Sequence, residues 1–235
     1  MTKMTSMKEF YDRLGYSFKD EDLFETAVTH SSYVREVGAP PSSCNERLEF
    51  LGDAYLDMVI SRKLFDLLPD EDEGVLTKYR AQIVCGASLA DIARQLGLGQ
   101  QLRLSKGEEQ TGGRDRESII ADAVEAVIAA IGLDGGYDEV KQFVLRNFDK
   151  RINDVINGKI YNDYKSALQE KLQQNGPVEI HYETTNEEGP DHDKTFYVEV
   201  RVNAETFGRG KGKSKKEAEQ NAAKNALDKG VADVL

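Results

Sequence analysis

The feature of this sequence that most restricts its fold is a thirteen-residue, almost entirely apolar run from Ile119 to Ile131. Eleven of its positions are Ile, Val or Ala, and the other two are Asp122 and Glu125. The run is longer than a typical strand and ends in a Gly-rich stretch, so it predicts a helix that is buried on nearly all sides. An ionised carboxylate is costly to bury without a partner. The two acids therefore need a compensating group from outside this helix.

Asp122 and Glu125 stand three residues apart, so on a helix they leave from one face and can converge on a single point. Two readings are open from this segment alone. The acids can be core residues matched by Arg or Lys from elsewhere, or an exposed stripe. They can also belong to a functional site that binds cations.

A second acidic segment, residues 45–53, opens a predicted helix that continues to about residue 65. At roughly 100° per residue, Glu46, Glu49 and Asp53 fall within an arc of about 60°, with apolar residues on the opposite side. A solvated amphipathic helix shows the same stripe. Phe50 argues against that reading, because it projects among the acids and so indicates a surface that something covers.

If the two predicted helices pack side by side, four carboxylates form a cluster of oxygen ligands. Like charges this close cannot all stay ionised without cations. Hard oxygen ligands without His or Cys favour Mg²⁺ or Mn²⁺ over Zn²⁺. The sequence therefore predicts a site for Mg²⁺, with Mn²⁺ able to substitute, formed by Glu49, Asp53, Asp122 and Glu125.

At these positions the chain resembles the ribonuclease III family of double-stranded-RNA endonucleases, in its bacterial single-chain form. Residues 46–53 are similar to the signature motif of the family, and residues 116–126 are similar to its second acidic helix. The resemblance also includes residues 29–33 and 72–74, and it extends over essentially the whole chain in the order of the family.

The resemblance implies a Mg²⁺-dependent endoribonuclease that leaves 5′-phosphate and 3′-hydroxyl ends and processes structured precursors of ribosomal and messenger RNA. Among the four ligands, Asp53 and Glu125 would be the catalytic residues. Glu46 and Glu73 would be accessory acids that shape the cleft or position RNA. The family is also expected to act as a homodimer, in which Phe50 enters the partner subunit and each subunit cuts one strand.

Hydrophobic periodicity divides the chain into two parts of different fold class. The first part is mainly helical, and a polar stretch, residues 153–162, follows it and reads as a linker. The second part shows the order α-β-β-β-α, which predicts an antiparallel sheet with both helices on one face. The first part has predicted helices at 6–13, 20–28, 45–67, 73–95, 115–132 and 137–152. The second has helices at 164–174 and 214–229 and strands at 181–186, 195–202 and 205–209.

We therefore expect a multidomain protein: an all-α ribonuclease III endonuclease domain at 1–153, a linker at 154–161 and a small α+β double-stranded-RNA-binding domain at 162–231. In the second family, the first helix and the first strand-to-strand loop touch minor grooves, and the start of the second helix contacts phosphates. By this resemblance the RNA contacts are Ser166, Gln169, Glu170, Gln173, His192, Lys213, Ser214, Lys215 and Lys216. Glu219 stands where many such domains carry a further Lys, which puts a third phosphate contact in doubt.

The net charge of −11 at first argues against an RNA partner. Five basic residues nevertheless lie between Arg209 and Lys216 with no acid among them, and the local charge at a contact matters more than the total. The sequence has no apolar membrane span or signal segment, and Cys44 and Cys85 form no disulfide framework. The expected location is the cytoplasm, without a membrane partner.

Two other readings of these motifs are weaker. Residues 208–214 look like a phosphate-binding P-loop, but the required first Gly is replaced by Phe207, so no nucleotide cofactor is expected. The alternative from another class is a non-catalytic RNA-binding protein whose acids are a relic or a structural ion site. The complete set of four acids disfavours it.

Overall fold

The computed structural model describes residues 2–158, 164–173, 176–190, 193–203 and 205–229. Two compact units divide the chain, residues 1–160 and 161–235, and each is considered by itself. His192, one of the predicted RNA contacts, lies outside the described residues, as do residues 159–161 of the predicted linker.

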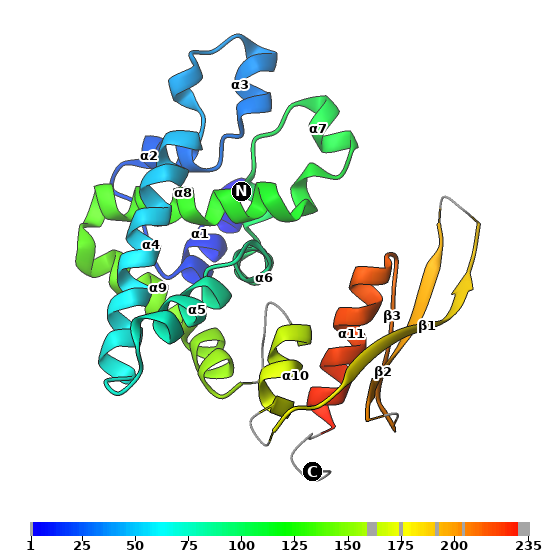
Figure 1. Cartoon of the computed structure of the whole chain (residues 1–235). Helices are drawn as coiled ribbons and strands as arrows, with labels where there is room; N and C mark the ends of the chain where they lie inside the picture. The colour runs from blue at the N-terminus through cyan, green and yellow to red at the C-terminus, as the bar shows by residue number, and fades with distance from the viewer. Residues whose placement is uncertain (1, 159–163, 174–175, 191–192, 204, 230–235) are drawn as a thin grey trace. The chain divides into compact units, whose positions relative to one another are not determined.

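The first unit is helical, as predicted (Figure 1). In its described part, the one extended pairing is an isolated parallel bridge between Thr29 and Arg103. Its helices are α1 (Thr2–Leu14), α2 (Glu21–Ala27), α3 (Ser31–Val37), α4 (Glu46–Leu67), α5 (Glu73–Ile83), α6 (Gly86–Leu96), α7 (Lys106–Gln110), α8 (Glu117–Gly135) and α9 (Tyr137–Ile156), with short 3₁₀ turns η1 (Pro41–Ser43), η2 (Leu98–Gln101) and η3 (Gly113–Asp115).

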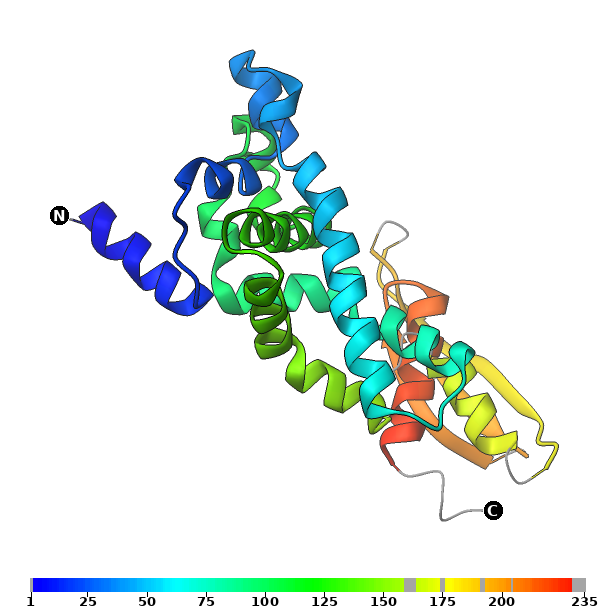
Figure 2. The ribbon, with the colours of Figure 1, turned by 90° about the vertical axis from the view of Figure 1, so that its left-hand side faces the viewer.

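Helix α8 forms the centre of this unit. All eleven apolar residues between Ile119 and Ile131 are buried, which confirms the predicted burial. Helices α2, α4, α6 and α9 pack around it, as the two views in Figures 1 and 2 show. The position of α8 therefore fixes the positions of the two acids within this run, Asp122 and Glu125.

Gly52 allows α4 to lie unusually close to α8. A Cβ atom at this position would overlap the backbone carbonyl group of Glu125. A glycine inside a helix normally reduces stability relative to alanine, so this one is explained by the close approach of two backbones. The contact lies between Glu49 and Asp53 on one helix and at Glu125 on the other.

The predicted helix at 73–95 is two helices, α5 and α6, which are separated at Val84 and Cys85. The guanidinium group of Arg151 on α9 donates to the carbonyl oxygen of Gln82 at 2.8 Å and to Cys85 Sγ at 3.4 Å. A side chain that is far away in the sequence thus binds a carbonyl oxygen near the end of α5. Local periodicity cannot predict a contact of this kind.

Other elements also differ from the prediction. Helices α3 and α7 lie where no helix was predicted, because each has seven residues or fewer and little periodicity. Helix α9 continues past its predicted end at residue 152 to Ile156, since Ile152 and Val155 are both buried. In the described part of the chain, no helix combines the length and apolar character needed to cross a membrane.

The second unit has the predicted α-β-β-β-α order: α10 (Tyr164–Gln173), β1 (Ile180–Glu188), β2 (Thr195–Val202), β3 (Glu205–Gly212) and α11 (Lys215–Asp228). The strands form an antiparallel sheet in the order β1-β2-β3. Every second residue of β2 is buried from Val198 to Val202. These valines share one core with Leu168 and Leu172 of α10 and the alanines of α11.

The Gly-rich segment that resembles a P-loop is strand β3. Cβ atoms at Gly208, Gly210 and Gly212 would lie too close to the backbone of α11, including that of Ala218 and Ala222. The glycines recur at every second position, so they share one face of the strand. Their role here is to let a helix lie directly on the sheet.

Candidate active site

Helix α4 carries its acids next to its close contact with α8, because the buried Gly52 lies between Glu49 and Asp53 in the sequence. The start of the helix is held by Asn45, which is buried, donates its backbone N–H to the carbonyl oxygen of Thr29 at 2.9 Å and accepts from the Glu49 N–H at 2.8 Å. Glu46 and Asp53 are exposed, whereas Glu49 is half-buried. Glu49 is thus the acid of this stripe that turns toward the neighbouring helix.

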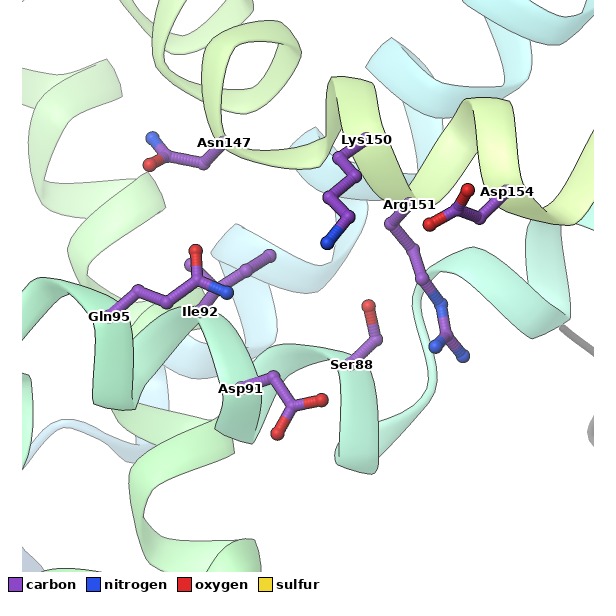
Figure 3. A pocket seen from close by; sticks show the side chains of 8 residues that line it. All are labelled: Ser88, Asp91, Ile92, Gln95, Asn147, Lys150, Arg151 and Asp154. Atoms are coloured by element: carbon purple, nitrogen blue, oxygen red, sulfur yellow. The ribbon is translucent and has the colours of Figure 1, made fainter. Parts of the chain in front are cut away.

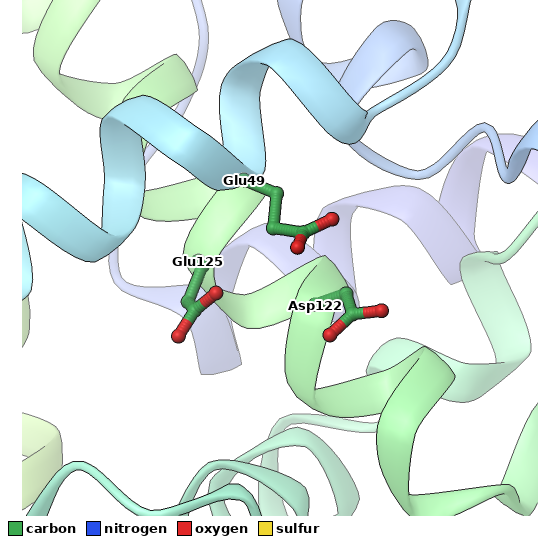
Figure 4. A group of neighbouring side chains, drawn as sticks. All are labelled: Glu49, Asp122 and Glu125. Carbon is green, nitrogen blue, oxygen red and sulfur yellow. The ribbon is translucent and has the colours of Figure 1, made fainter.

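Three carboxylates from the two helices converge, as Figure 4 shows. One ligand oxygen each from Glu49, Asp122 and Glu125 lies within 4.8 Å of the others. Asp122 and Glu125 are half-buried, while their apolar neighbours on α8 are buried. The two acids therefore occupy the face of α8 that α4 reaches.

The acids of the predicted set lack a cationic partner in the part of the chain that the structure describes. Among those residues, no Lys or Arg forms an ion pair with Glu49, Asp53, Asp122 or Glu125. The reading of core acids matched by Arg or Lys is therefore excluded within that part. Within the described residues, neither this helix pair nor its neighbours supply a Lys or Arg that pairs with these carboxylates.

The pKa values reflect this accumulation of charge. Burial, followed by the charges of Asp53, Glu49 and Asp122, raises the pKa of Glu125 to about 8. Burial and the neighbouring acids also raise the pKa of Glu49. Burial raises the pKa of Asp122, while the charge of His30 acts in the opposite direction. In the ion-free protein the cluster therefore holds a proton near neutral pH.

Asp53 is not part of the converging group of three. It lies one turn after Glu49 on α4 and is exposed, and it acts on Glu125 through its charge. Glu46 and Glu73, the two predicted accessory acids, are likewise not part of the group of three. Glu46 is exposed in the first turn of α4 and raises the pKa of Glu49.

Glu73 lies at the start of α5, where it accepts a hydrogen bond from Thr77 Oγ1 at 3.1 Å. It lines a cavity of about 530 Å³ together with apolar side chains that include Phe65. The same cavity is lined by Arg80, which pairs with Asp57 at 3.7 Å. Glu73 is thus separate from the group of three.

The sequence analysis did not identify three residues that affect the converging carboxylates. They are Gly52, which lies against Glu125, His30, which acts on Asp122, and Asp57, which acts on Glu125. A glycine between acids inside a predicted helix was the available signal for Gly52. The Nδ1 atom of His30 accepts from the Ser32 N–H at 3.2 Å and caps α3, and the charge of His30 acts to lower the pKa of Asp122. Asp57 continues the acidic stripe one turn beyond Asp53.

The donor set fits a hard divalent cation. It consists of carboxylate oxygens alone, from side chains that share one space and have no cationic partner among the described residues. Mg²⁺ is commonly held by one or two carboxylates and waters, and Mn²⁺ accepts the same ligands. Glu49, Asp122 and Glu125 could bind such an ion directly, with Asp53 beside them.

The predicted RNA contacts that the structure describes lie on the surface of the second unit. The four residues on α10 lie on the side opposite Leu168 and Leu172. At the start of α11, Lys213, Ser214, Lys215 and Lys216 are exposed, and the Ser214 hydroxyl accepts from the Glu217 N–H at 3.2 Å as the helix cap. Glu219, which stands where many such domains carry a further Lys, pairs with Lys165 of α10 at 2.7 Å.

Comparison with known protein families decides the assignment of both units. Residues 20–152, more than half of the chain, match the family model described as ribonuclease-III-like. Residues 164–229 match the model of the double-stranded RNA binding motif.

The chain belongs to the ribonuclease III family.

Curated relatives within the ribonuclease III family are similar over almost their whole length. Ribonuclease 3 of Caldanaerobacter subterraneus subsp. tengcongensis is 51% identical over 92% of this chain and 95% of the relative. Ribonuclease 3 of Clostridium botulinum strain Eklund 17B is 51% identical over 92% of each protein. A solved structure of the ribonuclease III nuclease domain of Campylobacter jejuni, which has a region involved in dimer formation, is 42% identical with a TM-score of 0.57; the match covers 61% of this chain and 96% of that structure.

The ribonuclease III unit has a further pocket, of about 150 Å³, between α6 and α9. Figure 3 shows Lys150 and Arg151 extending from α9 toward Ser88 and Asp91 of α6. None of the converging carboxylates lines it. Its acids and bases are mixed, and Arg151 is already bonded to the carbonyl oxygen of Gln82, so this pocket supports no catalytic assignment.

Proposed function

We propose that Glu49, Asp53, Asp122 and Glu125 hold one or two Mg²⁺ ions and that Asp53 and Glu125 are the catalytic residues of RNA cleavage. Family membership makes the protein a double-stranded-RNA endoribonuclease. The observation that carries the proposal is the convergence of three half-buried carboxylates without any described cation to balance them. The products carry 5′-phosphate and 3′-hydroxyl ends.

The protein residues act by position and charge. A bound divalent ion would supply activation of the attacking water and charge neutralisation on the leaving 3′ oxygen. The raised pKa values of Glu125 and Glu49 mean that the charged form of each is disfavoured in the ion-free protein, and a bound cation would favour that charged form. Asp53 is the one acid of the four that is exposed, and this exposure supports the proposal that it acts on the incoming phosphate.

A long RNA duplex incubated with the protein tests this proposal. Cleavage is expected with Mg²⁺ or Mn²⁺ and not with excess chelator, because the carboxylates alone repel a phosphodiester. Product lengths on a gel and end-group analysis provide the measurement. Duplex RNA that is bound but never cut under either condition would instead support the non-catalytic RNA-binding protein.

We also propose that two copies of the chain form a C₂ homodimer through the exposed face of α4. A large apolar side chain at Phe50 is 81% exposed, and Met58 and Phe65 on the same helix are 48% and 66% exposed. An apolar surface of this kind is typical of an interface. Two-fold symmetry then presents the four acids of one subunit to each strand of an RNA duplex.

Phe50→Glu is expected to convert the dimer to a monomer at micromolar concentration, because the new charge would be buried in the interface. Sedimentation equilibrium measures the mass. Val37→Glu is the matched control: Val37 is also a large exposed apolar residue, at 53% exposure, but lies on α3. A wild-type monomer that cuts both strands at full rate would contradict the dimer.

The remaining assignments follow from the same family resemblance. The endonuclease domain is proposed to span 1–153 and the RNA-binding domain 162–231, joined by a linker at 154–161. Structured precursors of ribosomal and messenger RNA are the proposed substrates, and a cytoplasmic location follows from them. The predicted contacts on α10 and at the start of α11, together with His192, are proposed to bind the duplex.

Changing Lys215 and Lys216 together to Ala is expected to weaken duplex binding about tenfold. Each lost phosphate contact should also lower the slope of log affinity against log salt by about 1. Fluorescence anisotropy at several salt concentrations, with chelator present, measures both quantities. Lys8→Ala combined with Lys19→Ala removes the same charge from the first unit and should leave the slope nearly unchanged. An unaltered slope in the first variant would exclude these lysines as phosphate contacts.

A further inference from the structure

Two lysines at the start of α11 are ion-paired with acids near the β1–β2 turn. Lys213 Nζ lies 2.7 Å from Asp193 Oδ1, and Lys215 Nζ lies 3.1 Å from Glu187 Oε1. Both lysines belong to the group proposed to bind phosphate. In the free protein, carboxylate oxygens therefore occupy the positions around these ammonium groups where phosphate oxygens would bind.

The acids are concentrated in an unexpected place for a domain with a polyanionic ligand. Residues 187–193 include four acids, Glu187, Glu188, Asp191 and Asp193. By contrast, no Lys or Arg lies in this segment, and Lys194 follows it. Unpaired, these charges would repel an RNA duplex that approached the turn between the strands.

The strand pairing of β1 with β2 places Glu187 where Lys215 can reach it. Glu187 pairs with Phe196 across β1 and β2, so the two side chains share the face of the sheet that carries α11. The Lys215 Nζ atom that pairs with Glu187 also lies over the Phe196 ring, 5.6 Å from its centre. Lys194 also approaches Glu187, at 3.7 Å.

The adjacent acid, Glu188, provides an internal contrast. Successive strand residues point to opposite faces, and Glu188 accepts hydrogen bonds from Tyr197 Oη and Asn186 Nδ2, each at 2.9 Å. No lysine pairs with it among the described residues. Glu187 and Glu188 thus carry the same charge one residue apart, but only Glu187 contacts α11.

We propose that Glu187 and Asp193 act as intramolecular substitutes for RNA phosphates, so that duplex binding exchanges two internal ion pairs for phosphate contacts. The inference rests on the proposed function, because it requires Lys213 and Lys215 to bind RNA. Exposed ion pairs contribute little to folding stability, so the pairs open without unfolding the domain. The two acids lower the affinity and set how strongly it depends on salt.

The exchange has a definite effect on counterions. A free lysine that binds phosphate releases a condensed cation from the RNA. When the lysine first leaves a carboxylate, that carboxylate attracts a cation from solution, which partly cancels the release. Neutralising Glu187 or Asp193 is therefore expected to tighten binding and to steepen its salt dependence at once.

The test uses the full-length protein, a blunt RNA duplex of about two helical turns and chelator to prevent cleavage. Glu187→Gln and Asp193→Asn are each expected to tighten binding about threefold at moderate salt, and to increase the salt slope, by up to about 1 for each pair. Glu188→Gln makes the same charge change without freeing a lysine, and its effect should stay below twofold. With Mg²⁺ present, the first two variants should lower KM for cleavage and leave kcat unchanged.

A double-mutant cycle identifies the lysine that responds. In a Lys215→Ala background, the gain from Glu187→Gln should fall toward the size seen for Glu188→Gln, because the lysine of α11 is no longer there to be freed and only the longer contact with Lys194, at 3.7 Å, remains. Weaker binding by Glu187→Gln would overturn the proposal, since the pair would then hold the turn in position for RNA. Equal effects of Glu187→Gln and Glu188→Gln would overturn it as well.

Failure of the proposed function gives a different result from failure of this inference. If Lys215→Ala alone leaves affinity and salt slope unchanged, Lys215 does not contact phosphate, and both the assignment and the inference are wrong. If Lys215→Ala weakens binding while Glu187→Gln matches Glu188→Gln, the phosphate contact stands and only the exchange of ion pairs is wrong.

Discussion

Glu125→Gln is expected to reduce cleavage of duplex RNA about a thousandfold, a loss of about 4 kcal/mol of transition-state stabilisation. The amide keeps the shape of the side chain but cannot carry the negative charge that a divalent ion requires. Because the RNA-binding unit is a separate compact unit, affinity for the duplex should stay within about twofold. Single-turnover cleavage and fluorescence anisotropy measure the two effects.

Glu9→Gln is the matched control, because Glu9 is exposed on α1 and outside the acidic group. It should cleave at the wild-type rate. Equal cutting by Glu125→Gln and the wild type would remove Glu125 from the site. Loss of both cleavage and binding would show that the substitution unfolds the protein, which circular dichroism detects.

The same variant has a second readout that does not depend on activity. The pKa of Glu125 is raised from 4.5 to about 8 in the folded protein, so between these pH values the folded state binds more protons than the unfolded state. Stability of the ion-free wild type therefore falls as pH rises through this window. In Glu125→Gln this fall should be smaller, and thermal unfolding with chelator at pH 5 and pH 8 measures the difference.

Part of the active site could be predicted from sequence because its chemical constraint is local. An apolar run with two acids specifies both a buried helix and a need for compensation, and the structure confirms the helix and its burial in α8. The way in which the four acids group was not predictable. Glu49 joins Asp122 and Glu125, while Asp53 stands to one side, and this depends on how α4 and α8 cross.

Other features depend on contacts between residues far apart in the sequence. The break between α5 and α6 involves Arg151, which donates to Gln82 from α9. Residue counts identified a basic segment before α11, yet they could not show that Asp193 and Glu187 already occupy two of its lysines. Sequence patterns give charge and periodicity, whereas pairing requires the register of strands and helices.

The crossing of α4 and α8 leads to the second large effect, in Gly52→Ala. A Cβ atom at residue 52 would overlap the backbone carbonyl group of Glu125, and a backbone group cannot move aside as a flexible side chain can. The helices must separate, which we expect to lower the free energy of unfolding by about 3 kcal/mol and the Tm by roughly 10 °C. Denaturant and thermal unfolding followed by circular dichroism measure this loss.

Gly52→Ala is a demanding test because alanine has a higher helix propensity than glycine. In an unobstructed helix, Gly→Ala normally increases stability by about 1 kcal/mol, so the expected sign is reversed. Gly107→Ala is the matched control, because Gly107 lies in α7 and a methyl group added there would meet nothing within 4 Å; it should be neutral or slightly stabilising. Cleavage by Gly52→Ala should also fall, since separation of the helices moves Glu49 away from Asp122 and Glu125. A Gly52→Ala variant as stable and active as Gly107→Ala would contradict the close approach that brings the three carboxylates together.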